Sequence, residues 1–285
     1  MEAAAIPWWV WPLALFALSF AIGIVAVLAG IGGGVLFVPL VAGFFPFHLD
    51  FVRAAGLLIA LSGALAASPR LLESGLASLR LGLPLALVGS VTAIAGAVLS
   101  FALPADALQV ALGVVILVAV AMIWGAPAAR RPAATSDSVG AALRMHGIYH
   151  DPASREEIAW RAQRTPAGLA GFALIGVIAG MFGLGAGWAN VPVLTLVMGV
   201  PLKLAVGTSG FVLSVIDTAA AWVYLHRGAV LPMLVVPSII GVMLGAKLGA
   251  RALVRAPTAL VRHAVLVLLT LAALRALTRG LGLWT

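Results

Sequence analysis

The chain has 285 residues, of which 63% are hydrophobic and only 9% are charged. A water-soluble domain carries about 25% charged residues, so 17 basic and 9 acidic side chains are too few to cover a soluble fold of this length. Composition therefore excludes a soluble enzyme, a disordered chain and a nucleic-acid-binding protein. The net charge of +8 is typical of arginine-rich loops on the cytoplasmic side of a membrane. The absence of cysteine excludes disulfides, thiol catalysis and a cysteine-ligated metal.

The hydrophobic segments predict membrane-spanning helices, each of which needs about 20 mostly apolar residues. No Lys or Arg precedes Arg53, so we expect the first apolar stretch to be a retained membrane segment rather than a cleaved signal peptide. The segments of suitable length lie at 51–68, 81–102, 107–124, 204–225, 229–250 and 259–277. Gly241, Gly245 and Gly249 recur every four residues, which predicts close packing of their helix against a neighbour.

Two further apolar stretches, 11–45 and 167–199, are too long for one span, and a glycine cluster interrupts each of them. The clusters lie at 30–34 and 183–187, and about eleven apolar residues containing a proline follow each one. Such sequences break helices at membrane depth, which is tolerated where protein or a water-filled cavity satisfies the freed backbone groups. Each break precedes a short helix, whose N-terminal N–H groups suit an anion. The alternative is that the glycines serve only close helix packing.

The polar stretch 125–166 separates two hydrophobic halves, and it holds six arginines and four acidic residues. The arginine excess predicts a cytoplasmic loop, in which 147–160 has the pattern of a small hairpin. The expected organisation is a first membrane repeat at 1–124, the cytoplasmic loop at 125–166 and a second membrane repeat at 167–285.

The two halves resemble each other at a shift of 153 residues. This shift pairs Gly30 with Gly183, Gly32 with Gly185, Gly34 with Gly187, Pro39 with Pro192, Gly75 with Gly228, Pro84 with Pro237 and Gly96 with Gly249. We place the 125–166 loop in the cytoplasm and assume that each broken segment leaves one side of the membrane and returns to the same side. Most basic turns then lie in the cytoplasm, and the two halves have opposite orientations in the membrane. We therefore expect an all-α polytopic membrane protein with two inverted repeats of about four hydrophobic segments each. Inverted repeats with broken helices are typical of secondary transporters. In these proteins the substrate site lies where the broken helices meet.

The sequences GIGGGVLFVP at 30–39 and GLGAGWANVP at 183–192 resemble the duplicated glycine-proline signature of the sulfite exporter TauE/SafE family. The segment GVPLKLAVGTS at 199–209 and the loop around 149–151 are similar to that family too. The chain departs from the pattern at Ala186 and at Leu57-Leu58. The resemblance implies a bacterial inner-membrane exporter or permease for sulfite, organosulfonates or related small anions. It implies a transporter and no enzyme.

We expect the substrate to bind at the breaks, where glycine amides and nearby polar side chains replace the hydration shell of a small anion. The candidate substrate-binding residues are Gly32, Gly33, Gly34, Gly185, Gly187, Asn190, Thr208 and Ser209. For Thr208 and Ser209 the alternative is a hydrogen bond to a carbonyl one turn earlier, and Asn190 could instead tie the broken backbone. We expect no catalytic residue, metal or cofactor, and partners limited to a small anion and the lipid bilayer.

Asp217 is the only acid near the middle of a predicted span, and it is the candidate for proton coupling. It could equally stay protonated and bond a neighbouring helix. The expected function is export of a sulfur-containing oxyanion by alternating access. A passive anion channel, a proton-coupled uptake permease and a membrane scaffold without transport are the alternatives. The anion, the direction of transport and the oligomeric state are left open.

Overall fold

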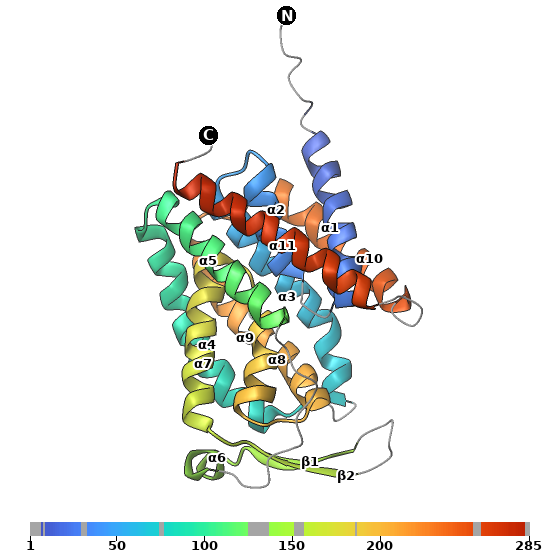
Figure 1. Cartoon of the computed structure of the whole chain (residues 1–285), viewed down its shortest axis with the longest axis vertical. Helices are drawn as coiled ribbons and strands as arrows, with labels where there is room; N and C mark the ends of the chain where they lie inside the picture. The colour runs from blue at the N-terminus through green and yellow to red at the C-terminus, as the bar shows by residue number, and fades with distance from the viewer. Residues whose placement is uncertain are drawn as a thin grey trace, which may run out of the picture.

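The computed structural model of the chain describes residues 7, 9–29, 33–73, 77–124, 137–150, 157–185, 187–252 and 258–282. These residues are almost entirely helical, and two short strands form a hairpin at one end of the molecule (Figure 1). The helices long and apolar enough to cross a membrane are Leu79–Ala102, Ala105–Met122, Thr165–Phe182, Leu202–His226 and Pro232–Gly249. The chain is therefore an all-α polytopic membrane protein, as its hydropathy predicts.

The first half of the chain forms five helices. The first predicted broken segment consists of a long helix and a shorter one, and three uninterrupted helices follow it. The five are α1 (Val10–Ala29), α2 (Gly33–Phe44), α3 (Leu49–Glu73), α4 (Leu79–Ala102) and α5 (Ala105–Trp124).

The second half repeats this order of elements. It begins with α7 (Thr165–Phe182) and continues, after the second glycine cluster, with α8 (Gly187–Pro192) and the π-helical turn η1 (Val193–Val197). Three uninterrupted helices follow, namely α9 (Leu202–His226), α10 (Pro232–Ala252) and α11 (Thr258–Gly280).

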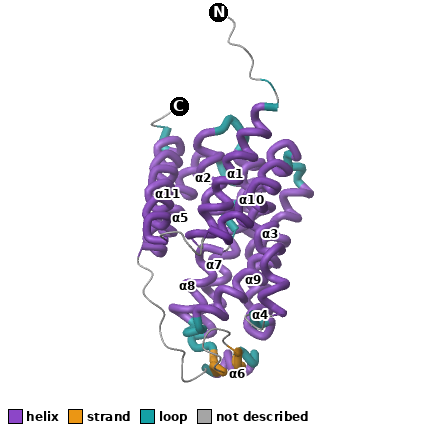
Figure 2. The backbone as a smooth tube through the Cα atoms, turned by 90° about the vertical axis from the view of Figure 1, so that its right-hand side faces the viewer, coloured by secondary structure: helices purple, strands orange, loops and turns teal. Residues whose placement is uncertain are grey.

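Helices of one half pack mainly against helices of the other half. The most extensive contacts join α1 to α10, α4 to α7, α5 to α11 and α3 to α9 (Figure 2). By their order in the two halves, α1 corresponds to α7, α3 to α9, α4 to α10 and α5 to α11. Exchanging the halves therefore turns the α1–α10 contact into the α7–α4 contact, and it leaves the α3–α9 and α5–α11 contacts unchanged. This pairing is what a two-fold relation between the halves would produce, and it supports the inverted repeat, which stays a prediction.

Glycines bring α10 and α1 into backbone contact. A Cβ added to Gly241 would lie 2.5 Å from the carbonyl oxygen of Phe16, and one added to Gly245 would lie 2.1 Å from that of Phe20. The same test on Gly249 gives 2.8 Å to the Ile24 carbonyl. The predicted close packing of this glycine series is confirmed. Small residues allow such approach where lipid supplies no hydrophobic drive for helix association.

Large apolar side chains cover the outward faces of the helices. Leu87 and Val91 on α4, Val118 on α5 and Val236 on α10 are among the most exposed of them. On a soluble protein such faces would signal an interface or an aggregation hazard. On this chain they form the surface that lipid covers.

The polar stretch between the halves forms a compact unit at one end of the molecule. A short helix, α6 (Ser138–Ala142), precedes strands β1 (His146–His150) and β2 (Glu157–Arg161), which pair antiparallel. The small hairpin expected at 147–160 is thus present. We call this end of the molecule the hairpin end, and the opposite end, where α5 begins and α11 stops, the far end (Figure 1).

Backbone and side-chain hydrogen bonds fasten the hairpin to the second broken segment. One carboxylate oxygen of Asp137 accepts a hydrogen bond from the N–H of Gly140 in α6, and the other accepts from the N–H of Thr165 at the start of α7. The N–H of Gln163 donates to the carbonyl oxygen of Met198, just after η1, at 3.0 Å. The hairpin unit therefore holds the beginning of α7 and the end of η1 together.

The hydrogen bonds to Asp137 affect its charge. Burial raises the pKa of this carboxyl, but the hydrogen bonds from the N–H groups of Gly140 and Thr165 outweigh that effect and hold the pKa below its ordinary value of 3.8. A carboxyl whose pKa is lowered by folding stabilises the folded form above its unfolded pKa. That contribution disappears as the pH falls through the lowered value.

We expect Asp137→Ala to speed hydrogen exchange in 137–150 and 157–165 about fivefold, because losing a helix cap costs about 1 kcal/mol. Exchange mass spectrometry on the purified protein measures this. The exposed neighbour Ser138 supplies the control, since Ser138→Ala should leave exchange unchanged. Acidifying the wild-type protein until Asp137 is protonated, at a pH below its lowered pKa, should reproduce the loss of protection seen in Asp137→Ala. Equal exchange in the two proteins would contradict the role of Asp137.

Candidate functional site at the helix breaks

The two breaks touch each other. A Cβ added to Gly34, at the start of α2, would lie 2.7 Å from the carbonyl oxygen of Leu184 in the second break and 3.0 Å from that of Gly56 on α3. A Cβ added to Gly56 would lie 2.4 Å from the carbonyl oxygen of Gly183. Only hydrogen atoms fit between these backbones. Gly34 after the first break, Gly56 on α3 and the Gly183–Leu184 backbone of the second break therefore form one contact region inside the helix bundle.

The second break depends on two glycines in the left-handed conformation. Gly183 has φ of 67° and ends α7, where its N–H donates to the carbonyl of Ala179. Gly185 has φ of 69°, a conformation that L side chains rarely adopt. A Cβ on Gly185 would meet Ala60 on α3 at 2.7 Å and the Oδ2 atom of Asp217 on α9 at 3.2 Å. The break thus runs directly past the Asp217 carboxyl group.

Asn190 and Asp217 are fully buried, and their polar atoms have no hydrogen-bond partner among the described residues. This holds for both side-chain atoms of Asn190, on α8, and for both carboxyl oxygens of Asp217. Buried polar groups in folded proteins nearly always have partners, because leaving one unsatisfied costs about 1–3 kcal/mol. Two such side chains on the helices that enclose the second break make this region the candidate functional site.

The remaining glycine candidates lie around the same region. A Cβ on Gly33 would contact side chains of Val242 and Ile59 at 3.1 and 3.4 Å, and one on Gly187 would contact Leu213 at 3.0 Å. Ile59 is adjacent in sequence to Ala60, which meets Gly185. The structure therefore brings Gly33, Gly34, Gly185 and Gly187 around α3 and α9. Gly32 lies outside the described residues.

Thr208 and Ser209 lie nearer the hairpin end than the breaks do. Thr208 is nine residues before Asp217 on α9, which corresponds to about 13 Å along a helix. Its Oγ1 accepts a hydrogen bond of 3.1 Å from the backbone N–H of Ser78, which caps the start of α4. Ser209 is buried beside it. Thr208 therefore has a structural partner, and the structure does not bring this pair to the Asp217 carboxyl.

Sequence reasoning gave no role to Arg53, although the residue as a whole is buried, with only 1% of its surface exposed. Its guanidinium pairs with Asp50, one turn earlier on α3, and its Nη1 donates to the carbonyl oxygen of Met181 at 3.1 Å. A Cβ on Gly183 would lie 2.1 Å from the Arg53 carbonyl oxygen. The signal in the sequence was the acid–base pair at a spacing of three, the distance at which side chains meet on a helix.

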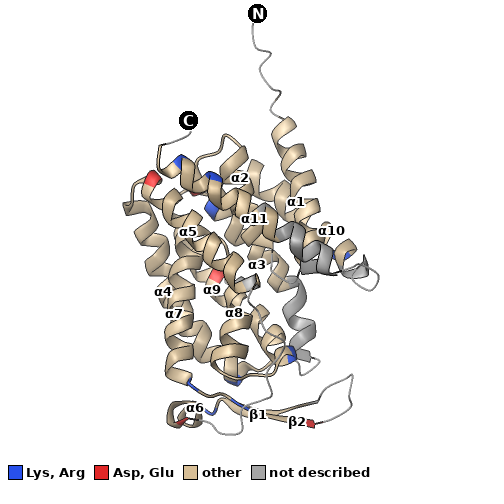
Figure 3. Ribbon diagram, in the orientation of Figure 1, with Lys and Arg blue, Asp and Glu red and all other residues tan. Residues whose placement is uncertain are grey.

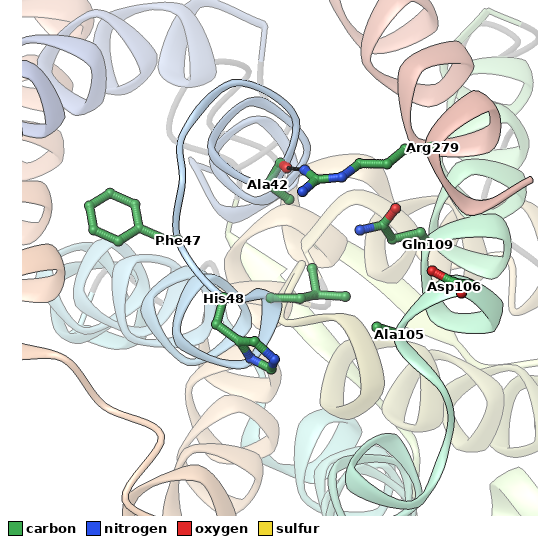
Figure 4. A pocket seen from close by; sticks show the side chains of 8 residues that line it. Ala42, Phe47, His48, Ala105, Asp106, Gln109 and Arg279 are labelled. Atoms are coloured by element: carbon green, nitrogen blue, oxygen red, sulfur yellow. Dashed lines mark hydrogen bonds between the residues drawn. The ribbon is translucent and has the colours of Figure 1, made fainter. Parts of the chain in front are cut away.

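A pocket of about 260 Å³ opens at the far end of the molecule. It lies where the α2–α3 connection, the start of α5 and the end of α11 meet, and Figure 4 shows Arg279 and Gln109 on one side with His48 opposite. Arg279 donates to the carbonyl oxygen of Ala42 at 3.0 Å. Asp106 lies on the same wall as Gln109. The pocket is thus polar on several sides, and its residues come from both halves of the chain.

The model of the family named sulfite exporter TauE/SafE matches residues 15–276 of the chain. This match spans both breaks and every helix that contributes to the site. The chain belongs to the sulfite exporter TauE/SafE family. Among curated proteins and solved structures no match is found, so the family model alone carries this assignment.

Membership in the TauE/SafE family makes the protein a membrane transporter, of a family that carries sulfite and related sulfur-containing anions, rather than an enzyme. The resemblance of its two glycine-proline sequences to this family is confirmed. Within the described residues no group of three His, Asp or Glu side chains could hold a metal ion. The candidate site contains backbone amides, the side chains of Asn190 and Asp217, and the guanidinium of Arg53 nearby.

We expect Gly34→Ala to destabilise the protein by about 1–3 kcal/mol and to remove most transport, because the added methyl group meets backbone atoms that cannot rotate away. Thermal unfolding in detergent and flux in liposomes measure the two effects. Gly63→Ala is the matched control on α3, since nothing lies within 4 Å of its added Cβ. Full stability and flux in Gly34→Ala would show that the breaks do not meet.

We expect Thr208→Val to lower the free energy of unfolding by about 1 kcal/mol with no change in anion affinity, because it removes the acceptor of the Ser78 N–H. Thermal unfolding and anion-binding titrations on the same preparation distinguish a structural role of Thr208 from a role in anion binding. Weakened anion binding at unchanged stability would instead place Thr208 in the binding site. Ser209→Ala provides the comparison one residue along.

Proposed function

We propose that this protein exports a small sulfur-containing oxyanion, such as sulfite or an organosulfonate, across the bacterial cytoplasmic membrane by alternating access. The observation that carries the proposal is the contact between the two breaks, with the unpartnered side chains of Asn190 and Asp217 beside the second one. In secondary transporters built from inverted repeats, discontinuous helices meet at the substrate site.

The site supplies groups that suit an anion. The N-terminus of α2 begins at Gly33, so its first N–H groups have no carbonyl partner within the helix. The amide of Asn190 adds a side-chain donor. Such donors replace water around an oxyanion, and glycine lets the backbone approach it closely. The proposed substrate-binding set is therefore Gly33, Gly34, Gly185, Gly187 and Asn190, with Gly32 as a candidate from sequence alone.

The charge distribution supports a cytoplasmic hairpin end. The hairpin unit and the adjoining helix starts carry mostly basic side chains, among them Arg144, Arg161, Arg164 and Lys203, whereas the far end carries both signs, with Asp50 and Asp106 beside Arg227, Arg275 and Arg279 (Figure 3). Basic residues accumulate on the cytoplasmic side of membrane proteins. In this orientation the substrate enters from the hairpin end and leaves through the far end.

The membrane potential favours export. With the inside negative, each negative charge that leaves the cell gains about 2.3 kcal/mol per 100 mV. Export of an anion therefore proceeds without proton coupling, whereas accumulation inside the cell requires a second ion. Potential-driven movement is the simpler mechanism for this site.

The buried carboxyl group of Asp217 favours a second candidate, which is proton-coupled uptake. A charged carboxylate without a partner is costly at membrane depth, so Asp217 in this conformation suits a protonated form that could release its proton during transport. The two functions differ in what Asp217 must do. Export driven by potential tolerates its replacement by asparagine, and proton-coupled uptake does not.

We expect purified protein in liposomes to move sulfite in a saturable manner when a potential is imposed without a pH gradient, and Asp217→Asn to retain that flux. A carboxylate such as acetate serves as the control anion. Flux that requires a pH gradient and is lost in Asp217→Asn would favour proton-coupled uptake. Flux that rises linearly with sulfite concentration would favour a passive channel, and absence of flux for every sulfur oxyanion would refute transport of this class.

A further inference from the structure

Arg53 is a buried cation between the far-end pocket and the second break. An arginine stays protonated in proteins, so its charge must be compensated within the bundle. The guanidinium carbon lies 5.9 Å from the ring centroids of both Phe101 and Tyr224. Asp50 supplies the compensating carboxylate, the Met181 carbonyl accepts from Nη1, and Nε has no partner among the described residues.

One partner of Arg53, the carbonyl of Met181, lies at the end of α7, where the second break begins. Met181 precedes Gly183 by two residues, and the Tyr224 hydroxyl donates to the carbonyl oxygen of Gly180 at 2.9 Å. Tyr224 is seven residues beyond Asp217 on α9, which corresponds to about 10 Å toward the far end. Arg53, which packs on the Tyr224 ring, therefore lies farther from the hairpin end than the Asp217 carboxyl, on the side toward which an exported anion would leave.

Asp50 contacts a residue that lines the pocket and is more exposed than Arg53. Its side chain is 26% exposed, whereas that of Arg53 is 2% exposed. The carboxylate also lies 3.3 Å from Nδ1 of His48, which lines the pocket. A solute in the pocket would therefore encounter His48 and Asp50 before it could reach the guanidinium.

We propose that Arg53 is an anion-binding residue on the exit side of the breaks, and that Asp50 is its resident counter-ion, which a small oxyanion replaces during transport. This inference rests on the proposed export function. The planar guanidinium matches two oxygens of an oxyanion as well as it matches a carboxylate. Because a buried arginine without a counter-ion is strongly unfavourable, Asp50 moves away only when another anion takes its place. The pair then opens for anions and stays closed to neutral solutes and cations.

The competing explanation is that the pair serves only the fold, since Arg53 also satisfies the carbonyl of Met181 near the C-terminus of α7. Both explanations allow Asp50→Asn to lower stability. They differ in anion affinity, because removing a competing carboxylate strengthens anion binding only if the anion uses the same guanidinium. The double variant Asp50→Asn/Arg53→Gln removes both charges together and leaves no uncompensated cation.

The test measures sulfite binding to the full-length protein in detergent, with size-exclusion profiles as the check on folding. We expect Asp50→Asn to lower the Kd for sulfite about tenfold, and the double variant to raise it at least about tenfold above the wild-type value. Asp106→Asn is the matched control, because it removes another far-end acid that lines the pocket. An unchanged Kd in both the single and the double variant would overturn the proposal.

A second readout needs no sulfite and uses the absence of native cysteine. Ser100 is buried, and its Oγ lies 3.2 Å from the hydroxyl of Tyr224, whose ring packs on the Arg53 guanidinium, so a buried cysteine at this position lies next to the Asp50–Arg53 pair. We expect Ser100→Cys to react with a membrane-impermeant maleimide about tenfold faster when Asp50→Asn is added. Equal rates with and without Asp50→Asn would overturn the proposed closure.

The outcomes separate this inference from the proposed function. Sulfite flux in the wild type with an unchanged Kd in the double variant would overturn the role of Arg53 and leave export intact. Sulfite binding that depends on Arg53, in a protein that moves no sulfite, would support the anion site and refute the exporter.

Discussion

The architecture of this transporter depends on how backbone groups are satisfied where a helix breaks inside a bilayer. The hydrocarbon supplies no hydrogen-bond partner, so irregular backbone at that depth must be covered by protein or by a water-filled path. Here the second break is covered by the first one and by α3, at distances that exclude any side chain between Gly34, Gly56 and the carbonyls of Gly183 and Leu184. The glycines therefore depend on one another, because a larger side chain at any one of them would collide with the backbone beside it.

The polar side chains follow from the same constraint. The side-chain polar atoms of Asp217 and Asn190 have no partner among the described residues, whereas the Arg53 charge is compensated by Asp50, by the Met181 carbonyl and by the faces of two aromatic rings. Charge inside a membrane protein is expensive, and it is retained where a function uses it. The paired guanidinium lies against the end of α7, and the unpartnered side chains lie beside the second break.

Hydropathy, glycine and proline positions predicted much of the fold. The spans, the interruptions of both long segments, the close packing of Gly241 and the hairpin all depend on local sequence, and local sequence was sufficient to find them. The partners of Thr208 and Arg53 depend on how α3, α4, α7 and α9 cross. The Ser78–Thr208 bond joins residues 130 positions apart, and the Arg53–Met181 bond joins residues 128 apart. No periodicity in the chain encodes such contacts, so the candidate site was predicted in part and the guanidinium beside it was missed.

The fastening of the hairpin unit to the second broken segment has a practical consequence. Asp137 joins α6 to the first residue of α7, and the Gln163–Met198 hydrogen bond joins the same unit to the residue after η1. Any rearrangement of that segment relative to α7 must therefore distort or release the hairpin. A fluorophore or a nanobody attached to the hairpin unit would therefore report such a rearrangement from outside the helix bundle, without occupying the path of the substrate.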